Sequence, residues 1–229
     1  MPTTLMVYKA QAKLLLVVAL CSCNHYVFAQ KRSISYGNPS PVGVSLGRYT
    51  PKTFKAMNAL PEGLRVKAVN HLRERLGDEF YSRLKFVSGS SIDIEEYFRI
   101  NPGTKWKVHS YELVFRYADS RRGLKEYYAR TRLDSKGEAI EEIDLPEVSK
   151  FPNKANIISV DAAADIAKSR GFESKTMNID IRYDEDAGSL VWIIETFARE
   201  DRYTSSTRVL VVDAHSGQIL KDGIETGTK

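Results

Sequence analysis

Histidine and serine residues are the first places to look for chemistry in this chain of 229 residues. The four histidines are His25, His71, His109 and His215. No two of them have the spacing of a metal-binding pair, and the pattern HExxH is absent. Residues 82–85 have the form S-x-x-K, but the further Ser and Lys elements that complete such a site are missing. We therefore expect no catalytic residue, no metal ligand and no cofactor, and a protein that is not an enzyme.

The acidic segment DEDAG, residues 184–188, is similar to half of a calcium-binding loop. A full loop needs a third acidic residue, a glycine at its sixth place and a distal glutamate that binds through both oxygens. In this chain the acidic residues stand between two expected strands, at hairpin distance. The spacing favours a solvated turn over a calcium site.

Two charged segments are candidates for contact with a partner. Arg121 and Arg122 stand in the loop of an expected hairpin, where they can face acidic partners or lipid headgroups. The irregular segment AREDRYTSS, residues 198–206, contains a tyrosine among charges, a composition typical of contact loops. Its candidate residues are Arg199, Asp201, Arg202 and Tyr203. The alternative for both segments is a solvated hairpin end.

The amino-terminal segment has the pattern of an export signal. An apolar run at residues 14–23 is too short to span a bilayer, which takes roughly 20 residues. Lys9 and Lys13 precede it, and small or apolar residues precede an expected cleavage after Ala29. Removing residues 1–29 takes away two lysines and no acidic residue, so the net charge falls from +5 to +3. That weak basicity argues against a nucleic-acid partner.

A lipoprotein signal is the alternative interpretation of the same segment. Residues 20–23, Leu-Cys-Ser-Cys, fit the pattern in which cleavage before Cys23 leaves a cysteine that carries lipid. We favour a soluble mature chain, periplasmic or secreted, over an outer-membrane lipoprotein anchored at Cys23. In either case both cysteines belong to the leader or its edge, so the folded part must be stable without disulfides.

The rest of the chain divides by its hydrophobic pattern. Residues 30–53 are rich in Gly, Pro and Ser and are expected to form a flexible lead-in. Apolar residues recur at helical spacing after Pro61 and again after Ser159. Alternating or apolar runs, typical of strands, follow each helix. They include residues 111–117 and 124–133 in the first half and 178–183, 189–197, 207–213 and 218–222 in the second.

An internal echo links the two halves. Residues 130–143 and 208–220 share one layout, in which a strand ends in Asp, a turn ends in Gly, and Ile follows. Asp134 and Asp213 can hydrogen-bond the turn backbone, and Gly137 and Gly217 can take positive φ. The echo predicts an α+β fold of two tandem units, residues 54–150 and 155–225, each a helix on an antiparallel sheet. A chance match between two generic hairpins is the alternative.

The second half resembles a PepSY domain. The resemblance covers residues 157–221 and rests on the helix VDAAADIAKSRGF, the strand pair NIDIRYDEDAGSLVWIIET and the closing VLVVDAHSGQIL. The first half resembles a more divergent copy, because a long insert separates its helix from its hairpin. The resemblance implies helix-and-sheet modules outside the cytoplasm, found in propeptides of metallopeptidases and proposed to inhibit peptidases. Function must still be argued from a site, because one fold serves many functions.

These observations predict an exported, non-enzymatic protein of the cell envelope that binds a protein partner. A peptidase that the chain inhibits or regulates is one such partner, and an edge strand is the expected means of contact. The alternative is a periplasmic small-ligand carrier or sensor with an aromatic pocket. The aromatic residues expected to line it are Tyr111, Phe115, Tyr117, Tyr127, Tyr128 and Trp192. An enzyme of unrecognised type stays open, because polar groups from both halves can meet in the folded chain.

Overall fold

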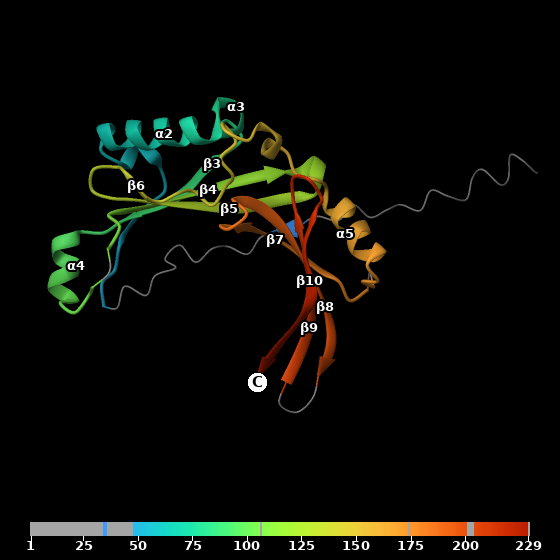
Figure 1. Ribbon diagram of the computed structural model, residues 1–229. Coiled ribbons are helices and arrows are strands. Elements are labelled where there is room, and N and C mark those ends of the chain that lie inside the picture. The colour runs from blue at the N-terminus through green and yellow to red at the C-terminus, as the bar shows by residue number, and fades with distance from the viewer. Residues whose placement is uncertain (1–33, 36–47, 106, 174, 201–203, 229) are drawn as a thin grey trace, which may run out of the picture. The chain divides into compact units, whose positions relative to one another are not determined.

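The computed structural model describes residues 34–35, 48–105, 107–173, 175–200 and 204–228 (Figure 1). The export signal at residues 1–29, the cleavage after Ala29 and the lipid-bearing Cys23 all lie outside the described residues. The same holds for most of the lead-in at residues 30–53.

The first sheet occupies the amino-terminal half of the described chain. Its strands are β1 (Ile34–Ser35), β2 (Lys52–Phe54), β3 (Lys85–Ser91), β4 (Tyr111–Asp119), β5 (Leu124–Leu133) and β6 (Ala139–Glu141). Their order is β1-β5-β4-β3-β2, and β6 also pairs with β5. Every pairing is antiparallel except the short parallel contact of β1 with β5. The long alternating strands β4 and β5 therefore form its centre.

The second sheet follows in the carboxyl-terminal half. Its strands are β7 (Asn178–Asp184), β8 (Ser189–Glu200), β9 (Thr204–Asp213) and β10 (Ile219–Thr228). Their order is β10-β9-β8-β7, with every neighbour antiparallel. This is a simple meander, in which each strand returns beside the one before it. The strands β8 and β9 lie inside the sheet, and β10 and β7 are its edges.

The described helices are α2 (Glu62–Leu76), α3 (Asp78–Tyr81), α4 (Ile94–Ile100) and α5 (Val160–Ser169). Short 3-10 turns are η1 (Met57–Ala59), η2 (Ser120–Arg122) and η3 (Pro152–Ala155). In α2 every fourth residue from Leu64 to Leu76 is buried, which is the stripe that the sequence predicts. Ser159 caps α5 by accepting a hydrogen bond from the Ala162 N–H at 3.2 Å, as its place before the apolar run predicts.

One hydrophobic cluster joins both halves of the described chain. It holds Leu72 of α2, Tyr117 of β4, Ala163 of α5 and Trp192 of β8, together with buried residues of every long strand between them. Trp192 is 0% exposed, so the indole lies at the centre of this core. A smaller second cluster gathers beneath α4 and contains Tyr49, Ile92 and Tyr97.

The expected α+β fold of two tandem helix-on-sheet units is wrong. Antiparallel sheet dominates the described chain, and its four α-helices have 15, 4, 7 and 10 residues. Two physical features explain the difference. The first is that strands extend beyond the apolar runs from which they were predicted. β10, expected at residues 218–222, continues to Thr228 through mostly polar residues. The apolar faces of both halves also pack into the single cluster rather than into one core each. The unit boundaries at 54–150 and 155–225 stay a prediction.

The two echoed turns have the local geometry that their sequences predict. Asp134 Oδ1 accepts the N–H groups of Lys136 and Glu138 at 2.8 and 3.0 Å. Asp213 Oδ1 accepts those of His215 and Ser216 at 3.0 and 2.7 Å. The glycines that close these turns, Gly137 and Gly217, have φ of +85° and +77°. Each turn is therefore held by its own aspartate and needs glycine at its end.

Candidate functional site

The structure brings together only part of the predicted contact residues. Arg121 and Arg122 lie in the turn η2, between β4 and β5, and both are exposed. Arg199 lies in β8, and its side chain is not among those described. Residues 201–203, which include Asp201, Arg202 and Tyr203, lie outside the described chain. Of the predicted contact residues, Arg121 and Arg122 are therefore the two whose side chains the structure describes.

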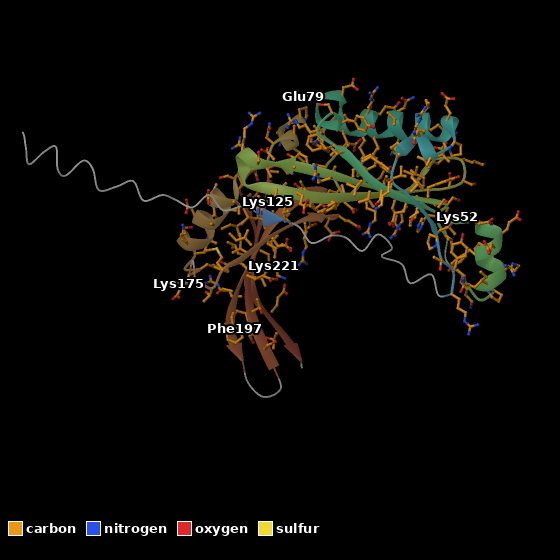
Figure 2. The ribbon with its side chains drawn as sticks, turned by 180° about the vertical axis from the view of Figure 1, so that it is seen from behind. Lys52, Glu79, Lys125, Lys175, Phe197 and Lys221 are labelled. Atoms are coloured by element: carbon orange, nitrogen blue, oxygen red, sulfur yellow. The ribbon has the colours of Figure 1, made fainter. Side chains whose placement is uncertain are left out.

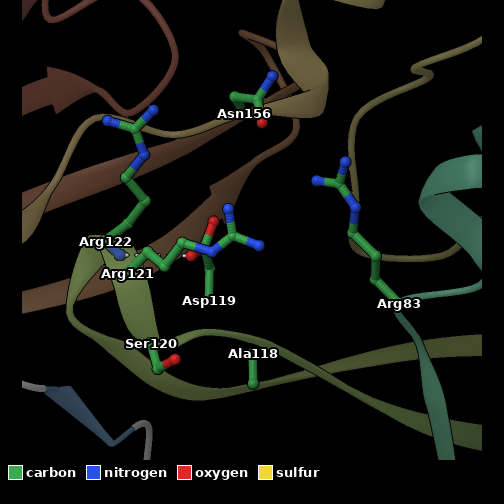
Figure 3. A pocket seen from close by; sticks show the side chains of 7 residues that line it. All are labelled: Arg83, Ala118, Asp119, Ser120, Arg121, Arg122 and Asn156. Atoms are coloured by element: carbon green, nitrogen blue, oxygen red, sulfur yellow. Dashed lines mark hydrogen bonds between the residues drawn. The ribbon is translucent and has the colours of Figure 1, made fainter.

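Arg121 and Arg122 line a surface hollow of about 620 Å³, which we call the arginine hollow (Figure 3). Its lining residues are Arg83, Ala118, Asp119, Ser120, Arg121, Arg122 and Asn156. Three separate segments supply them: the loop after α3, the end of the β4–β5 hairpin, and the residue after η3. The tertiary fold therefore joins the hairpin arginines to a third arginine that is distant in sequence.

Arg83 is held in place on its side of the hollow. Its Nη2 donates to Glu79 Oε1 at 2.6 Å, and its Nη1 donates to the Ala155 carbonyl at 3.3 Å. Its guanidinium also lies 5.9 Å from the centre of the Phe80 ring. These contacts come from the helix α3 and from the turn η3, so the position of Arg83 depends on both.

The hairpin side of the hollow is fixed by Asp119. Asp119 Oδ1 accepts the Arg122 N–H at 3.3 Å and so caps the turn that carries both arginines. Within the described chain, neither Arg121 nor Arg122 has a carboxylate within 4.0 Å as an ion-pair partner. Figure 3 shows the guanidinium groups of Arg83 and Arg121 extending into the same space. The lining residues that the structure describes are rich in N–H donors and include one carboxylate, that of Asp119.

The charged residues of the hollow affect the pKa of a buried tyrosine in β4. Tyr117 of β4 is 1% exposed, and burial raises the pKa of its hydroxyl to about 12. That pKa of about 12 already includes a rise from the nearby Asp119 carboxylate and an opposing effect of the Arg83 guanidinium. The Tyr117 phenol therefore stays neutral at physiological pH and serves as packing, with its ring stacked on Phe80 at 5.2 Å.

The open side of the second sheet is the other surface of interest. β10 pairs with β9 on one side over its whole length, and among the described residues no strand pairs with its other side. β7 ends opposite Glu195, so the last five residues of β8 also have one open side there. Phe197, Leu220 and Ile224 on these strands are 58%, 44% and 66% exposed. Figure 2 shows Phe197 and Lys221 on this sheet.

The charged side chains of β10 are already paired within the chain. Lys221 Nζ lies 2.6 Å from Glu225 Oε1, and Asp222 Oδ1 lies 3.2 Å from Arg208 Nη2. Arg208 in turn stacks over the Phe172 ring at 4.5 Å. Charged residues on an edge normally deter another strand from pairing. In β10 that deterrent is reduced, because each charge has a partner of opposite sign.

Two of the described histidines, His71 and His215, make hydrogen bonds to other parts of the chain. His71 Nε2 lies 2.8 Å from Glu142 Oε2. His215 Nδ1 donates to the Asn156 carbonyl at 2.8 Å, which leaves Nε2 to accept the Leu190 N–H at 3.3 Å. Burial lowers the pKa of His215, and the two contacts together require the neutral ring. Burial likewise lowers the pKa of His109. His25 lies outside the described residues.

In the S-x-x-K and DEDAG motifs, side chains form hydrogen bonds with backbone groups. Ser82 Oγ donates to the Glu79 carbonyl at 2.7 Å, so its hydroxyl is tied to the end of α3. In the DEDAG turn, Asp184 Oδ1 accepts the Ala187 N–H at 2.9 Å. Lys154 Nζ donates to the carbonyls of Ala187 and Gly188 at 3.2 and 3.0 Å. The Lys154 ammonium therefore binds two backbone carbonyls of this turn.

Within residues 34–35 and 48–228, less the few that are not described, no three His, Cys, Asp or Glu side chains are placed to hold a metal ion. None of the helices described there is long and apolar enough to cross a bilayer.

The aromatic residues considered for a carrier pocket belong mostly to the core. Phe115, Tyr117, Tyr127 and Trp192 are 2%, 1%, 4% and 0% exposed, and all four lie in the main cluster. Phe115 packs edge-on against Phe86 at 5.6 Å. These rings therefore fill space that an apolar ligand would need.

Sequence reasoning identified Arg121 and Arg122 but not Arg83 or Asn156. The contact between Arg83 and the Ala155 carbonyl spans 72 residues, and nothing in the local sequence of either segment predicts it. Sequence reasoning also missed the length of β10, because its second half is polar and lacks the strand pattern. The Asp222-Gly223 pair is moreover a common turn signal, and it favours an end of the strand at the point where β10 in fact continues.

Comparisons with protein-family models, with curated proteins and with solved structures find no match for this chain. The resemblance to PepSY domains therefore stays a prediction from the sequence.

Proposed function

We propose that this protein is a non-enzymatic binding protein that receives an extended segment of a partner protein along β10. The observation that carries the proposal is the open edge of the second sheet, which is ten residues long and bears exposed apolar side chains. The other open edges of the described sheets are shorter: β1 has two residues, β2 and β6 have three each, and β7 has seven.

An open edge offers a row of backbone N–H and C=O groups to a second strand. Addition of a strand satisfies these groups, so affinity comes from main-chain hydrogen bonds and selectivity from side chains. β10 keeps one register with β9 from Lys221 to Thr228, after a shift between Ile219 and Lys221, so most of the edge is already formed before a partner arrives. Binding to a formed edge orders only the partner segment, which lowers the entropy loss of association.

Leu220 and Ile224 give this edge its side-chain selectivity. On paired strands, opposite side chains have Cβ atoms roughly 4.5–5.5 Å apart. A partner strand beside β10 therefore places its own side chains against these two exposed apolar residues. With Lys221 and Asp222 neutralised by their ion pairs, the edge favours an uncharged segment with apolar residues at alternate positions.

The proposal extends to location and partner class. The amino-terminal pattern supports export to the periplasm or beyond, and the lipid-anchored form at Cys23 is the alternative. A peptidase is a partner of the stated kind when an extended segment at its cleft pairs with β10, as an added strand pairs with a sheet edge. Inhibition or regulation of such a peptidase is therefore part of the proposal.

A site-specific photo-cross-linker at position 224 tests the proposal in envelope extracts of the native source. Position 66 is the matched control, because Val66 is also an exposed apolar residue (48%) but lies on α2. We expect a partner to be cross-linked from position 224 and not from 66. With that partner purified, amide hydrogen exchange of β10 should slow on binding.

The variant Ile224→Lys should weaken partner binding by roughly tenfold or more, because it places a charge against an apolar segment. Val66→Lys should leave binding unchanged. A purified peptidase partner is then assayed with the wild-type chain and with Ile224→Lys. Equal cross-linking from both positions, cross-linking only to a second copy of this chain, or unchanged exchange in β10 would refute strand addition to a partner protein.

A further inference from the structure

The arginine hollow is separate from the β10 edge, because none of its described lining residues belongs to β8, β9 or β10. We propose that the hollow binds a ligand through a phosphate group held by Arg83, Arg121 and Arg122. The ligand is a polar phosphoester, either free in solution or part of a phospholipid headgroup.

The donors of the hollow favour phosphate over carboxylate. A guanidinium presents five N–H donors in a planar fork and no acceptor. A carboxylate has two coplanar oxygens, which suit a single fork. The arginines of this hollow enter from two separate segments, the loop after α3 and the hairpin end. The oxygens of a tetrahedral phosphate point in several directions, so phosphate accepts hydrogen bonds from both sides at once.

The charge balance also favours binding of an anion. Glu79 at 2.6 Å offsets Arg83, but Arg121 and Arg122 have no carboxylate within ion-pair distance in the described chain. Among the described lining residues Asp119 has the one carboxylate, and its Oδ1 is engaged by the Arg122 backbone N–H. The hairpin guanidiniums therefore keep positive charge that a phosphate group neutralises.

The hollow is prepared for binding and has room for more than a bare ion. Arg83 is already held by Glu79 and the Ala155 carbonyl, so little of its freedom is lost when a ligand binds. The volume of about 620 Å³ lies within the roughly 300–1,000 Å³ of small-molecule sites. The Ser120 hydroxyl and the Asn156 amide add neutral hydrogen-bonding groups. The body attached to the phosphate is therefore expected to be polar.

The test is titration calorimetry of the chain with three probes: inorganic phosphate, glycerol 1-phosphate, and glycerol as the neutral control. Co-sedimentation with vesicles of phosphatidylglycerol and phosphatidylcholine, against phosphatidylcholine alone, examines the lipid source. Saturable binding of glycerol 1-phosphate but not glycerol indicates a soluble phosphoester. Binding only to the anionic vesicles indicates a headgroup.

Variants decide whether the hollow is the binding site. The double variant Arg121→Gln with Arg122→Gln should bind the active probe at least about tenfold more weakly, because charge-assisted hydrogen bonds are lost. Replacing both by Lys keeps the charge but removes the fork, so its affinity should fall between. Arg170→Gln is the matched control, since Arg170 is exposed and outside the hollow, and its affinity should stay within about twofold. Circular dichroism confirms that each variant is folded.

Two results would overturn the proposal. One is that no phosphate-bearing probe binds the wild-type chain saturably, in solution or on vesicles. The other is that the double glutamine variant binds the active probe as tightly as the wild-type chain.

Discussion

Replacing the two echoed aspartates by alanine should reveal how differently they stabilise the same kind of turn. Asp213 accepts four hydrogen bonds: from the His215 N–H, from the N–H and hydroxyl of Ser216, and from the Ser189 hydroxyl, at 2.7–3.0 Å. Asp134 accepts two, both from backbone N–H groups. The pair allows a comparison in which the turn is similar and the side-chain contacts differ.

The magnitude follows from burial and from the number of donors. Asp213→Ala leaves the Ser189 hydroxyl without its partner, and Ser189 is 1% exposed, which alone costs about 1–3 kcal/mol. Loss of the charge-assisted bonds to the turn adds about 1.5–3 kcal/mol. We therefore expect Asp213→Ala to lower the free energy of unfolding by about 3–5 kcal/mol. Asp134→Ala breaks bonds that water replaces, so we expect about 1 kcal/mol.

The loss of unfolding free energy in Asp213→Ala should also depend on pH. Burial alone would raise the pKa of Asp213, but the hydrogen bonds from Ser189 and Ser216 outweigh it and lower the pKa below its ordinary value. A carboxyl with a lowered pKa in the folded state stabilises the fold fully above the unfolded pKa of about 3.9. This stabilisation is lost as the pH falls through the folded pKa. The difference between wild type and Asp213→Ala should therefore shrink in acid.

Urea unfolding at neutral and acid pH measures each quantity, with circular dichroism as the signal. The reasoning fails if Asp134→Ala destabilises the chain as much as Asp213→Ala does. It also fails if the loss in Asp213→Ala is the same at both pH values.

Three further predictions concern the core, the first sheet and acid stability. Trp192→Ala should lower the free energy of unfolding in urea by about 3–5 kcal/mol, because the indole is 0% exposed; an unchanged midpoint would place it outside the core. Gly89→Ala should lower the free energy of unfolding by about 1–3 kcal/mol, because a Cβ there would overlap the Phe54 ring. In a double-mutant cycle, Gly89→Ala should cost much less when Phe54→Ala is already present. Additive losses would contradict the overlap. Burial lowers the pKa of His215, so the stabilisation from its neutral ring is full above about pH 6.5 and is lost as the pH falls through the folded pKa. His215→Gln should therefore lose less stability than wild type between pH 7 and pH 5 in thermal melts, and equal losses would count against this role.

Local features of the fold were predictable from the sequence. The buried stripe of α2, the capping of α5 by Ser159 and the two aspartate turns each depend on residues within about one helical turn or one hairpin. In such short segments the backbone's own hydrogen-bonding needs decide the structure, so residue types suffice. The hairpin of β4 and β5 follows in the same way from alternation on both sides of one turn.

Long-range features were not predictable. The end of β10 is a strand because β9 lies beside it and takes its hydrogen bonds, not because residues 225–228 favour a strand. The arginine hollow depends on a loop, a hairpin and a 3-10 turn that meet only in the folded chain. The prediction of the fold class was wrong for the same reason. Two similar layouts predict two cores, and only the tertiary structure shows that their apolar faces merge.

The merged core makes the folded chain a single thermodynamic unit. Because buried residues of both sheets and of α2 and α5 contact one another in one cluster, neither half can lose its packing without exposing the other's apolar surface. Cleavage within residues 151–156 should therefore not release two independently stable fragments. A molecule that binds only the native state raises the melting temperature of the whole cooperative unit, wherever it binds. One thermal-shift screen thus detects occupants of the β10 edge and of the arginine hollow alike.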